Sequence, residues 1–331
     1  MTDLTTEYLG LTLPNPIIAS ASPLTGSLDT LLELQGAGAA AVVLPSLFEE
    51  QVEHDSLAID HSLQIGSATS AEALGGFFPE LDQYNTGADE YLDLLVQAKR
   101  ELAIPIIASL NGISDGGWIE YAKALEGEGA DAIELNIYLV AADPDATAAE
   151  GEDRCLRLVS HVRSWIKIPL AVKIGPSFSS PANMARRLGE AGADAIVVFN
   201  RFYQPDIDLE TLDIKPDLEL STPAEMRLVL RWVAIMAGRI GAQLAATTGV
   251  HDAEGVVKLL LAGADVTMMT SALLQRGTSH LALVLGETQR WFDDHGYASV
   301  SQARGSVSQQ SVPDPVAFER ANYMKTLVSY G

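Results

Sequence analysis

The pattern of apolar and polar positions along the chain repeats one unit, in which a helix-like stretch and a glycine precede a short apolar run. The glycine is followed by alanine at four places, which begin at Gly38, Gly129, Gly192 and Gly263. Glycine suits the left-handed conformation just after a helix end. The apolar run is too short for a helix and indicates a strand buried on both faces. Four such units predict an architecture of alternating helices and strands.

Eight strands are predicted in all, with helical segments between them. Their ranges are 16–20, 41–44, 105–110, 132–136, 170–174, 195–199, 242–246 and 266–269. The helical segments include 118–125, 183–188, 224–240 and 255–261, and an amphipathic stripe through Tyr91, Leu95, Ala98 and Leu102. This alternation predicts an α/β fold, a closed (β/α)8 TIM barrel. The alternative is a doubly wound open sheet, which would want a glycine-rich phosphate loop after the first strand.

Segments outside this repeat occur at both ends of the chain and in two long stretches that follow predicted strands. The stretch YLGLTLPNPI, from Tyr8, predicts a short N-terminal β-hairpin that plugs the bottom of the barrel. Segments 48–89 and 202–223 follow strands, so we expect them at the top face, as a lid or a dimer contact. We expect residues 1–305 to form the barrel domain, 306–315 a polar linker and 317–330 a C-terminal helix.

Composition narrows the classes of partner. The chain has 331 residues, of which 47% are hydrophobic, and a net charge of −23 that argues against nucleic acid or anionic membranes. The N-terminus does not resemble a signal peptide, and no apolar run approaches the ~20 residues that span a bilayer. We therefore expect a cytoplasmic protein. Cys155, the single cysteine, falls on an apolar stripe with Val159 and Val162, which predicts a packed core thiol.

Polar residues gather where the predicted strands end, which is where such barrels carry their chemistry. These positions hold Ala19, Ser20, Pro45, Asn111, Asn136, Lys173, Asn200, Thr247, Thr248, Gly249, Thr270 and Ser271. An asparagine amide both donates and accepts, which suits a planar ring with carbonyl and N–H groups. Lys173 lies inside the apolar run PLAVKIGP and is expected to point at the mouth, where its cation would stabilise negative charge on a bound ring.

The turns after the last two strands, TTGV and TSAL, are built from small residues. Backbone N–H groups in such turns, next to a helix N-terminus, form the usual phosphate cradle of barrels. The six histidines are scattered along the sequence, and acidic residues are sparse at the strand ends. No metal site is predicted, because one would want clustered His, Asp or Glu.

In this order, these residues resemble the dihydroorotate dehydrogenase family of FMN-containing barrels, from about Tyr8 to Gly305. The opening YLGLTLPNPIIASAS, the ELN of strand four and the VKIGP of strand five carry the likeness, as do the two small-residue turns. The resemblance implies an FMN site, a small-molecule substrate and a homodimer. The implied cofactor residues are Ala19, Ser20, Asn111, Asn136, Lys173, Thr248, Gly249, Thr270 and Ser271.

The resemblance also assigns roles. Lys173 matches the lysine that contacts the flavin near its N1–C2 edge, and Asn136 and Asn200 match residues that bind the orotate-like substrate. In the family, a cysteine or serine base takes a proton from C5 of dihydroorotate while the hydride from C6 goes to flavin N5. That position is Leu139 here, which cannot accept a proton, and its neighbour Tyr138 is a poor base at neutral pH.

Other family positions differ as well. Pro45 replaces an expected lysine, Ala141 an asparagine, and Thr248 and Thr270 two glycines of the phosphate turns. The catalytic base is therefore left unassigned, although a carboxylate from Asp143 or Asp145 is an alternative.

Three functions follow from these observations. The first is an FMN-dependent oxidoreductase that acts on a dihydropyrimidine-like CH–CH donor, with an implied place in pyrimidine biosynthesis. The second is a flavin-binding or degenerate barrel without dihydroorotate turnover, which serves in electron transfer or assembly. The third is a flavin-free aldolase or isomerase in which Lys173 forms a Schiff base.

Overall fold

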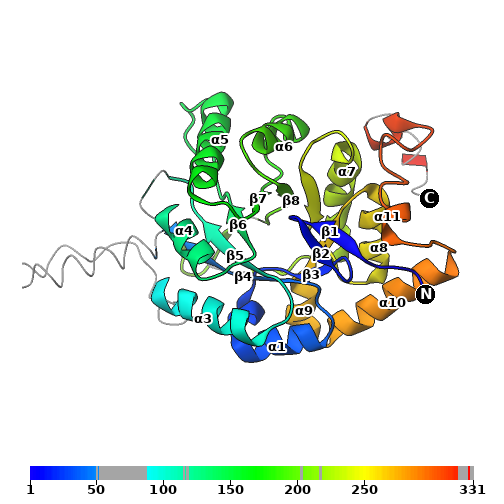
Figure 1. Cartoon of the computed structure of the whole chain (residues 1–331). Helices are drawn as coiled ribbons and strands as arrows, with labels where there is room; N and C mark the ends of the chain where they lie inside the picture. The colour runs from blue at the N-terminus through cyan, green and yellow to red at the C-terminus, as the bar shows by residue number, and fades with distance from the viewer. Residues whose placement is uncertain are drawn as a thin grey trace, which may run out of the picture.

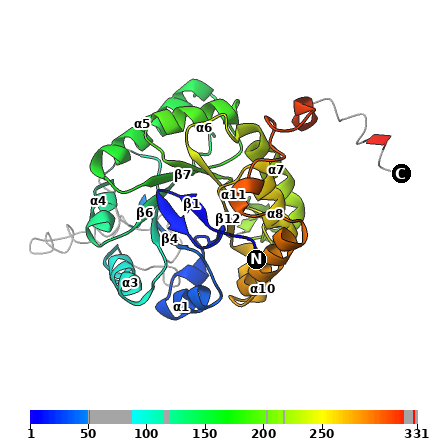
Figure 2. The ribbon, with the colours of Figure 1, turned by 45° about the vertical axis from the view of Figure 1, so that its right-hand side comes forward.

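Eight parallel strands close into a barrel that helices surround (Figures 1 and 2). The computed structural model describes residues 1–49, 51, 88–114, 116, 119–201, 204–215, 218–319 and 327–328. The barrel order is β11-β12-β3-β4-β5-β6-β7-β8. These strands are β3 (Ile17–Ala19), β4 (Val42–Phe48), β5 (Ile106–Asn111), β6 (Ala132–Asn136), β7 (Leu170–Ile174), β8 (Ala195–Val198), β11 (Gln243–Ala246) and β12 (Val266–Met269). The predicted (β/α)8 barrel is confirmed, and the open sheet is wrong.

Helices cover the outside of the strands and bury their apolar faces there. They are α1 (Leu28–Gly36), α3 (Ala88–Glu101), α4 (Glu120–Gly127), α5 (Ala148–Trp165), α6 (Pro181–Glu190), α7 (Met226–Met236), α8 (Ala253–Ala262), α9 (Ser271–Arg276), α10 (His280–Asp294) and α11 (Val300–Ala303). The four repeated glycines all have positive φ angles, as predicted. At Gly263, a Cβ atom would lie 2.3 Å from the Cβ of Ala237, so the close approach of the two segments also requires glycine.

The predicted N-terminal hairpin is confirmed and closes the bottom of the barrel. β1 (Thr6–Tyr8) pairs with β2 (Leu11–Leu13), and the hairpin crosses the middle of the ring of strands in Figure 2. Tyr8, Leu9 and Leu13 are buried in one apolar cluster with short side chains of the strands, namely Ala41, Ala132, Ala171, Ala195 and Ala245. Because alanine leaves space inside the barrel, the larger hairpin residues fill it. Burial, together with the charge of Glu134, raises the pKa of Tyr8 well above its usual range.

Cys155 lies in α5 and is buried in the core between helix and barrel. Burial raises the pKa of its thiol to about 11, so the thiolate is scarce at neutral pH. The prediction of a core thiol is confirmed.

The segment predicted as a C-terminal linker packs on two barrel helices. Val307 N donates to Leu261 O of α8 at 2.9 Å, and Gln309 N donates to Ala234 O of α7 at 2.9 Å. A 3-10 helix, η4 (Pro315–Phe318), follows. The predicted helix 317–330 lies largely outside the described residues, as does segment 48–89.

Segment 202–223 holds a small hairpin that the sequence did not predict. β9 (Asp206–Ile207) pairs with β10 (Ile214–Lys215), and both isoleucines are exposed. The roles of this segment as a lid or dimer contact stay predictions. Within the described part of the chain, no helix combines the length and apolar character needed to cross a membrane.

Candidate active site

One pocket opens at the carboxyl ends of the barrel strands, the end opposite the hairpin. Its volume is about 620 Å³, a size typical of small-molecule and cofactor sites. Each of the eight strands, or the turn that follows it, supplies lining residues, which include Ala21, Pro45, Asn111, Asn136, Lys173, Asn200, Thr247 and Met268. The structure thus places the candidate chemistry where barrels of this kind carry their active sites.

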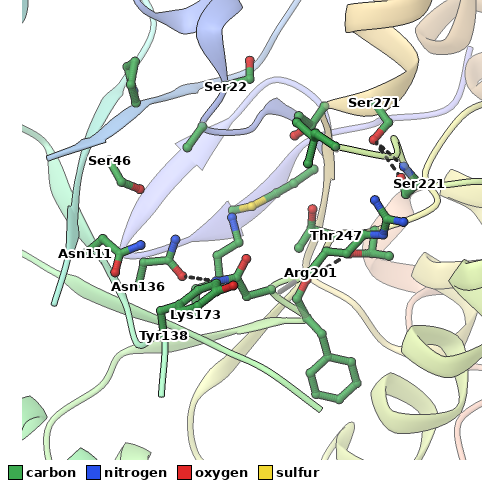
Figure 3. Close-up of a pocket in the computed structure, with 18 of the residues that line it drawn as sticks. Ser22, Ser46, Asn111, Asn136, Tyr138, Lys173, Arg201, Ser221, Thr247 and Ser271 are labelled. Atoms are coloured by element: carbon green, nitrogen blue, oxygen red, sulfur yellow. Dashed lines mark hydrogen bonds between the residues drawn. The ribbon is translucent and has the colours of Figure 1, made fainter. Parts of the chain in front are cut away.

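The three predicted asparagines come together in this pocket. Strand register sets Asn111 beside Asn136, and Asn136 beside Lys173. The Nδ2 of Asn200 donates to the Oδ1 of Asn136 at 2.8 Å. Figure 3 shows Asn111, Asn136 and Lys173 on one side of the pocket. The predicted convergence of three amides and one ammonium group is therefore found in the structure.

Lys173 is held from below by a buried carboxylate that the sequence analysis missed. Its Nζ lies 3.2 Å from the Oε1 of Glu134 and 3.5 Å from the Oγ of Ser20. Glu134 precedes Asn136 by two residues on β6, so both side chains point into the barrel. A glutamate inside a predicted strand that is buried on both faces could have indicated a buried ion pair, because a buried charge requires a partner.

The turn after β11 keeps a glycine-like conformation although it carries a threonine. Thr248 has a φ of 77° and Gly249 a φ of 78°. Thr248 Oγ1 donates to Phe199 O at 3.0 Å, which helps to hold the threonine in this unfavourable region. A Cβ atom on Gly249 would lie 2.6 Å from Met226 N, so this position admits only glycine.

Ser221 joins the two small-residue turns, a contact that the sequence did not predict. Its backbone N and its Oγ lie 3.0 and 2.9 Å from Ser271 Oγ, and Gly249 N donates to Ser221 Oγ at 3.3 Å. Thr248, Thr270 and Ser271 all line the pocket, and Ser221 and Ser271 lie across it from the asparagines in Figure 3. The turns thus form a second polar wall.

Two helices begin next to these turns, and their N-termini differ. The side chain of Asp252 caps α8 by accepting from Gly255 N at 2.9 Å. α9 begins after Thr270 without a side-chain cap. The acidic cap makes α8 a poor neighbour for phosphate, so the small-residue turns themselves are left as the main source of donors.

Two predicted cofactor residues do not line the pocket. Ala19 is buried in the barrel wall among apolar residues, and Ser20 lies under Lys173. The first strand contributes Ala21, Ser22 and Pro23 instead. β3 ends at Ala19, and the chain reaches the mouth only after this turn, which the sequence could not locate to one residue.

Leu139, which the resemblance matches to the family base, also lies outside the pocket lining. It packs against α5, where a Cβ atom on Gly151 would lie 3.5 Å from the Cδ2 of Leu139. Tyr138 lines the pocket instead (Figure 3). Asp143 and Asp145, the predicted alternative carboxylates, are exposed and do not line it.

His251 is the histidine nearest a strand end, and it lies buried just after the β11 turn. Burial lowers the pKa of its imidazole, which keeps the ring neutral at pH 7. It is not among the residues that line the pocket. Across the described ranges, no three His, Cys, Asp or Glu side chains form a group suited to a metal ion.

Comparison with known proteins identifies the family. The sequence model of the family described as dihydroorotate dehydrogenase matches residues 71–290, about two thirds of the chain. A Methanothermobacter thermautotrophicus protein named dihydroorotate dehydrogenase B (NAD(+)), catalytic subunit, is 26% identical over 309 residues, which cover 91% of this chain and 97% of that protein. Proteins of the same name from Thermoplasma acidophilum and Bacillus mycoides are 26% and 24% identical over 320 and 326 residues. They cover 92% and 94% of this chain, and 99% of each relative. The chain belongs to the dihydroorotate dehydrogenase family.

Proposed function

We propose that the chain is an FMN-dependent oxidoreductase that takes a hydride from a CH–CH bond of a dihydropyrimidine-like small molecule. The observation that supports this most is the convergence of Lys173 with three asparagine side chains at the floor and wall of one pocket. The family relatives named above support the same class of reaction.

The two walls of the pocket suit the two ends of FMN. The ammonium of Lys173 and the amides of Asn111 and Asn136 match the donors and acceptors of an isoalloxazine edge. The turn at Thr248 and Gly249 and the turn at Thr270 and Ser271 line the pocket, where small residues and backbone N–H groups suit a phosphate. The donor set therefore fits the cofactor, which when bound would supply the hydride acceptor at N5.

The chain's own residues would bind and orient the reactants. Lys173 holds a positive charge where negative charge develops on a bound ring. The hydrogen bond between Asn200 and Asn136 fixes one amide against the other, so the substrate ring meets donors whose positions are set in advance. Both effects favour hydride transfer.

Proton abstraction is where this chain differs from the family pattern. Leu139 cannot serve as a base and packs against α5. Glu49 lines the pocket but accepts from Ile113 N at 2.7 Å and Ser114 N at 3.2 Å, which ties it to a turn. Loss of a general base costs ~10²–10⁴-fold in rate, so we expect slow turnover of dihydroorotate. The observation at Leu139 favours, as a second candidate, a flavin-binding barrel without this turnover.

The Schiff-base alternative fits the site less well. A Schiff base needs a neutral amine, whereas Lys173 is ion-paired with Glu134, and its loss of a proton would leave that carboxylate unpaired in the barrel. The place in pyrimidine biosynthesis, the cytoplasmic location and the homodimer stay predictions.

A titration with FMN tests the proposal. The flavin-free protein should bind one FMN per chain, seen as quenching of flavin fluorescence, and Lys258→Met on the surface of α8 should bind equally well. The double variant Lys173→Met/Glu134→Gln removes the cation without leaving a buried charge and should bind at least about tenfold more weakly. A wild-type protein that binds no FMN would refute both flavin functions.

Turnover then separates the two flavin functions. Dihydroorotate is offered with fumarate, NAD or a quinone, and flavin reduction is followed under anaerobic conditions. Reduction by dihydroorotate supports the oxidoreductase, and bound FMN that stays oxidised supports the second candidate. Borohydride trapping of Lys173 with a carbonyl compound would support the Schiff base instead.

A further inference from the structure

Glu134 is a fully buried carboxylate inside the barrel, with no exposed surface. Burial of such a charge is costly unless a cation and hydrogen bonds compensate it. Its Oε1 is 3.2 Å from Lys173 Nζ, while its Oε2 has no hydrogen-bond partner among the described residues. Among the described residues, the ion pair with Lys173 is therefore what compensates this charge, and the two side chains are energetically coupled.

The two members of the ion pair lie at different depths relative to the pocket. Lys173 lines the pocket, whereas Glu134 does not. The ammonium thus lies between the carboxylate and any ligand. An ammonium has three donors, and two of them reach Glu134 and Ser20, neither of which lines the pocket. One donor is left for a ligand.

We propose that Glu134 is the positioning residue and counter-charge of Lys173. It fixes the ammonium at the pocket floor and neutralises it, so a ligand that gains negative charge meets an ion pair instead of an isolated cation. Glu134 thereby lowers the stabilisation that Lys173 gives to an electron-rich ring. The flavin part of this inference rests on the proposed function, and the coupling of the two residues does not.

The substitution Glu134→Gln tests the effect of the carboxylate charge separately from that of its hydrogen bond to Lys173. Glutamine keeps an oxygen acceptor of the same reach for Lys173 Nζ and removes the negative charge. The floor then carries an uncompensated ammonium beneath the site of the ring. Reduced flavin holds extra negative charge at its N1–C2 edge, so the variant should favour the reduced form.

The first measurement is the midpoint potential of FMN bound to each protein. Glu134→Gln should shift the ratio of reduced to oxidised flavin at a fixed potential by about tenfold, which is about 30 mV upward for two electrons. Glu134→Asp, which keeps the charge, should stay closer to wild type than Glu134→Gln does. Glu190→Gln removes one carboxylate from an exposed ion pair with Arg186 and should shift the ratio less than about threefold. A Glu134→Gln protein that behaves like Glu190→Gln would overturn the counter-charge role.

The second measurement needs no flavin. Unfolding by urea is compared for flavin-free wild type, Glu134→Gln, Lys173→Met and the double variant. Lys173→Met should be destabilising in the wild-type background and much less so beside Glu134→Gln, with unfolding constants that deviate from additivity by at least about tenfold. If Lys173→Met folds only in the double variant, the coupling is also supported, whereas additive effects would overturn it. If wild type binds no FMN, the proposed function fails and this cycle alone decides the role of Glu134.

Discussion

The two ends of the barrel are built from the same strands and differ in almost every other respect. Ala132 of β6 and Ala171 of β7 lie in the apolar cluster at the bottom, whereas Asn136 of β6 and Lys173 of β7 line the pocket at the mouth. The bottom is filled by the apolar hairpin around Tyr8. The mouth keeps an open pocket of about 620 Å³, whose lining includes the asparagines and Lys173.

This difference shows how one strand serves both stability and function. Side chains inside a barrel alternate along each strand, so a step of two residues moves from one layer to the next. Glu134 lies between Ala132 and Asn136 on the inner face of β6, and its carboxylate contacts the ammonium of Lys173. The bottom should therefore control unfolding, and the mouth should control binding.

The largest effect is expected at the plug. Tyr8→Ala should lower the free energy of unfolding by about 3–5 kcal/mol, because it empties a fully buried aromatic position. Tyr8→Phe should cost nothing or stabilise, because the Tyr8 hydroxyl has no hydrogen-bond partner within the part of the chain that is described. Urea unfolding measures both, and equal losses for the two variants would contradict the account.

Cys155, which lies in the core between α5 and the barrel, should react slowly with thiol reagents. Since burial raises the pKa of Cys155 to about 11, its alkylation rate should still be rising at a pH where the unfolded thiol has levelled off. At pH 8, native protein should react with iodoacetamide about a hundredfold more slowly than urea-unfolded protein, because thiolate is scarcer. Equal rates, followed by mass spectrometry, would show that Cys155 is accessible and activated.

At the mouth, Asn136→Ala should affect binding more than folding. Loss of its amide should weaken ligand binding about tenfold, and the free energy of unfolding should fall by only about 1 kcal/mol. Asn183→Ala, at an exposed position of α6, is the matched control and should change neither. If Asn136→Ala strongly lowers the free energy of unfolding yet binds FMN as tightly as the wild type, the separation between the two ends is contradicted.

The smallest effect is expected at the β11 turn. Thr248→Gly relieves the positive φ angle, whereas Thr248→Val keeps the branched side chain and loses the bond to Phe199 O. The glycine variant should be more stable than the valine variant by about 1 kcal/mol. Thr247 has no positive φ angle, so Thr247→Gly should instead destabilise by about 0.5–1 kcal/mol. The reverse order in thermal melting would show that the turn is not strained.

Much of this arrangement follows from local sequence. Short apolar runs, four of them preceded by a glycine after a helix, are sufficient to predict the strands, and the ends of those strands carry the asparagines and Lys173. The site residues that the sequence did not predict depend on contacts between segments far apart in the chain. Ser221 reaches Ser271 across fifty positions, and Glu134 finds Lys173 only through the register of β6 and β7.

An error of one or two residues in a predicted strand end changes which residues are expected to line the pocket. β3 ends at Ala19, which moved the lining from Ala19 and Ser20 to the next residues. Likewise, the resemblance matches Leu139 to the family base, but only the structure shows that Leu139 packs against α5 while Tyr138 lines the pocket. Side-chain direction in a loop depends on packing that sequence spacing does not encode.

A crystal structure of the protein grown with FMN would show whether the pocket at the mouth holds the flavin. We expect an isoalloxazine whose N1–C2 edge faces Lys173, with Asn136 and Asn200 on the substrate side and the phosphate between the turns at Gly249 and Ser271. A pocket without flavin, or flavin bound on another surface, would contradict this expectation.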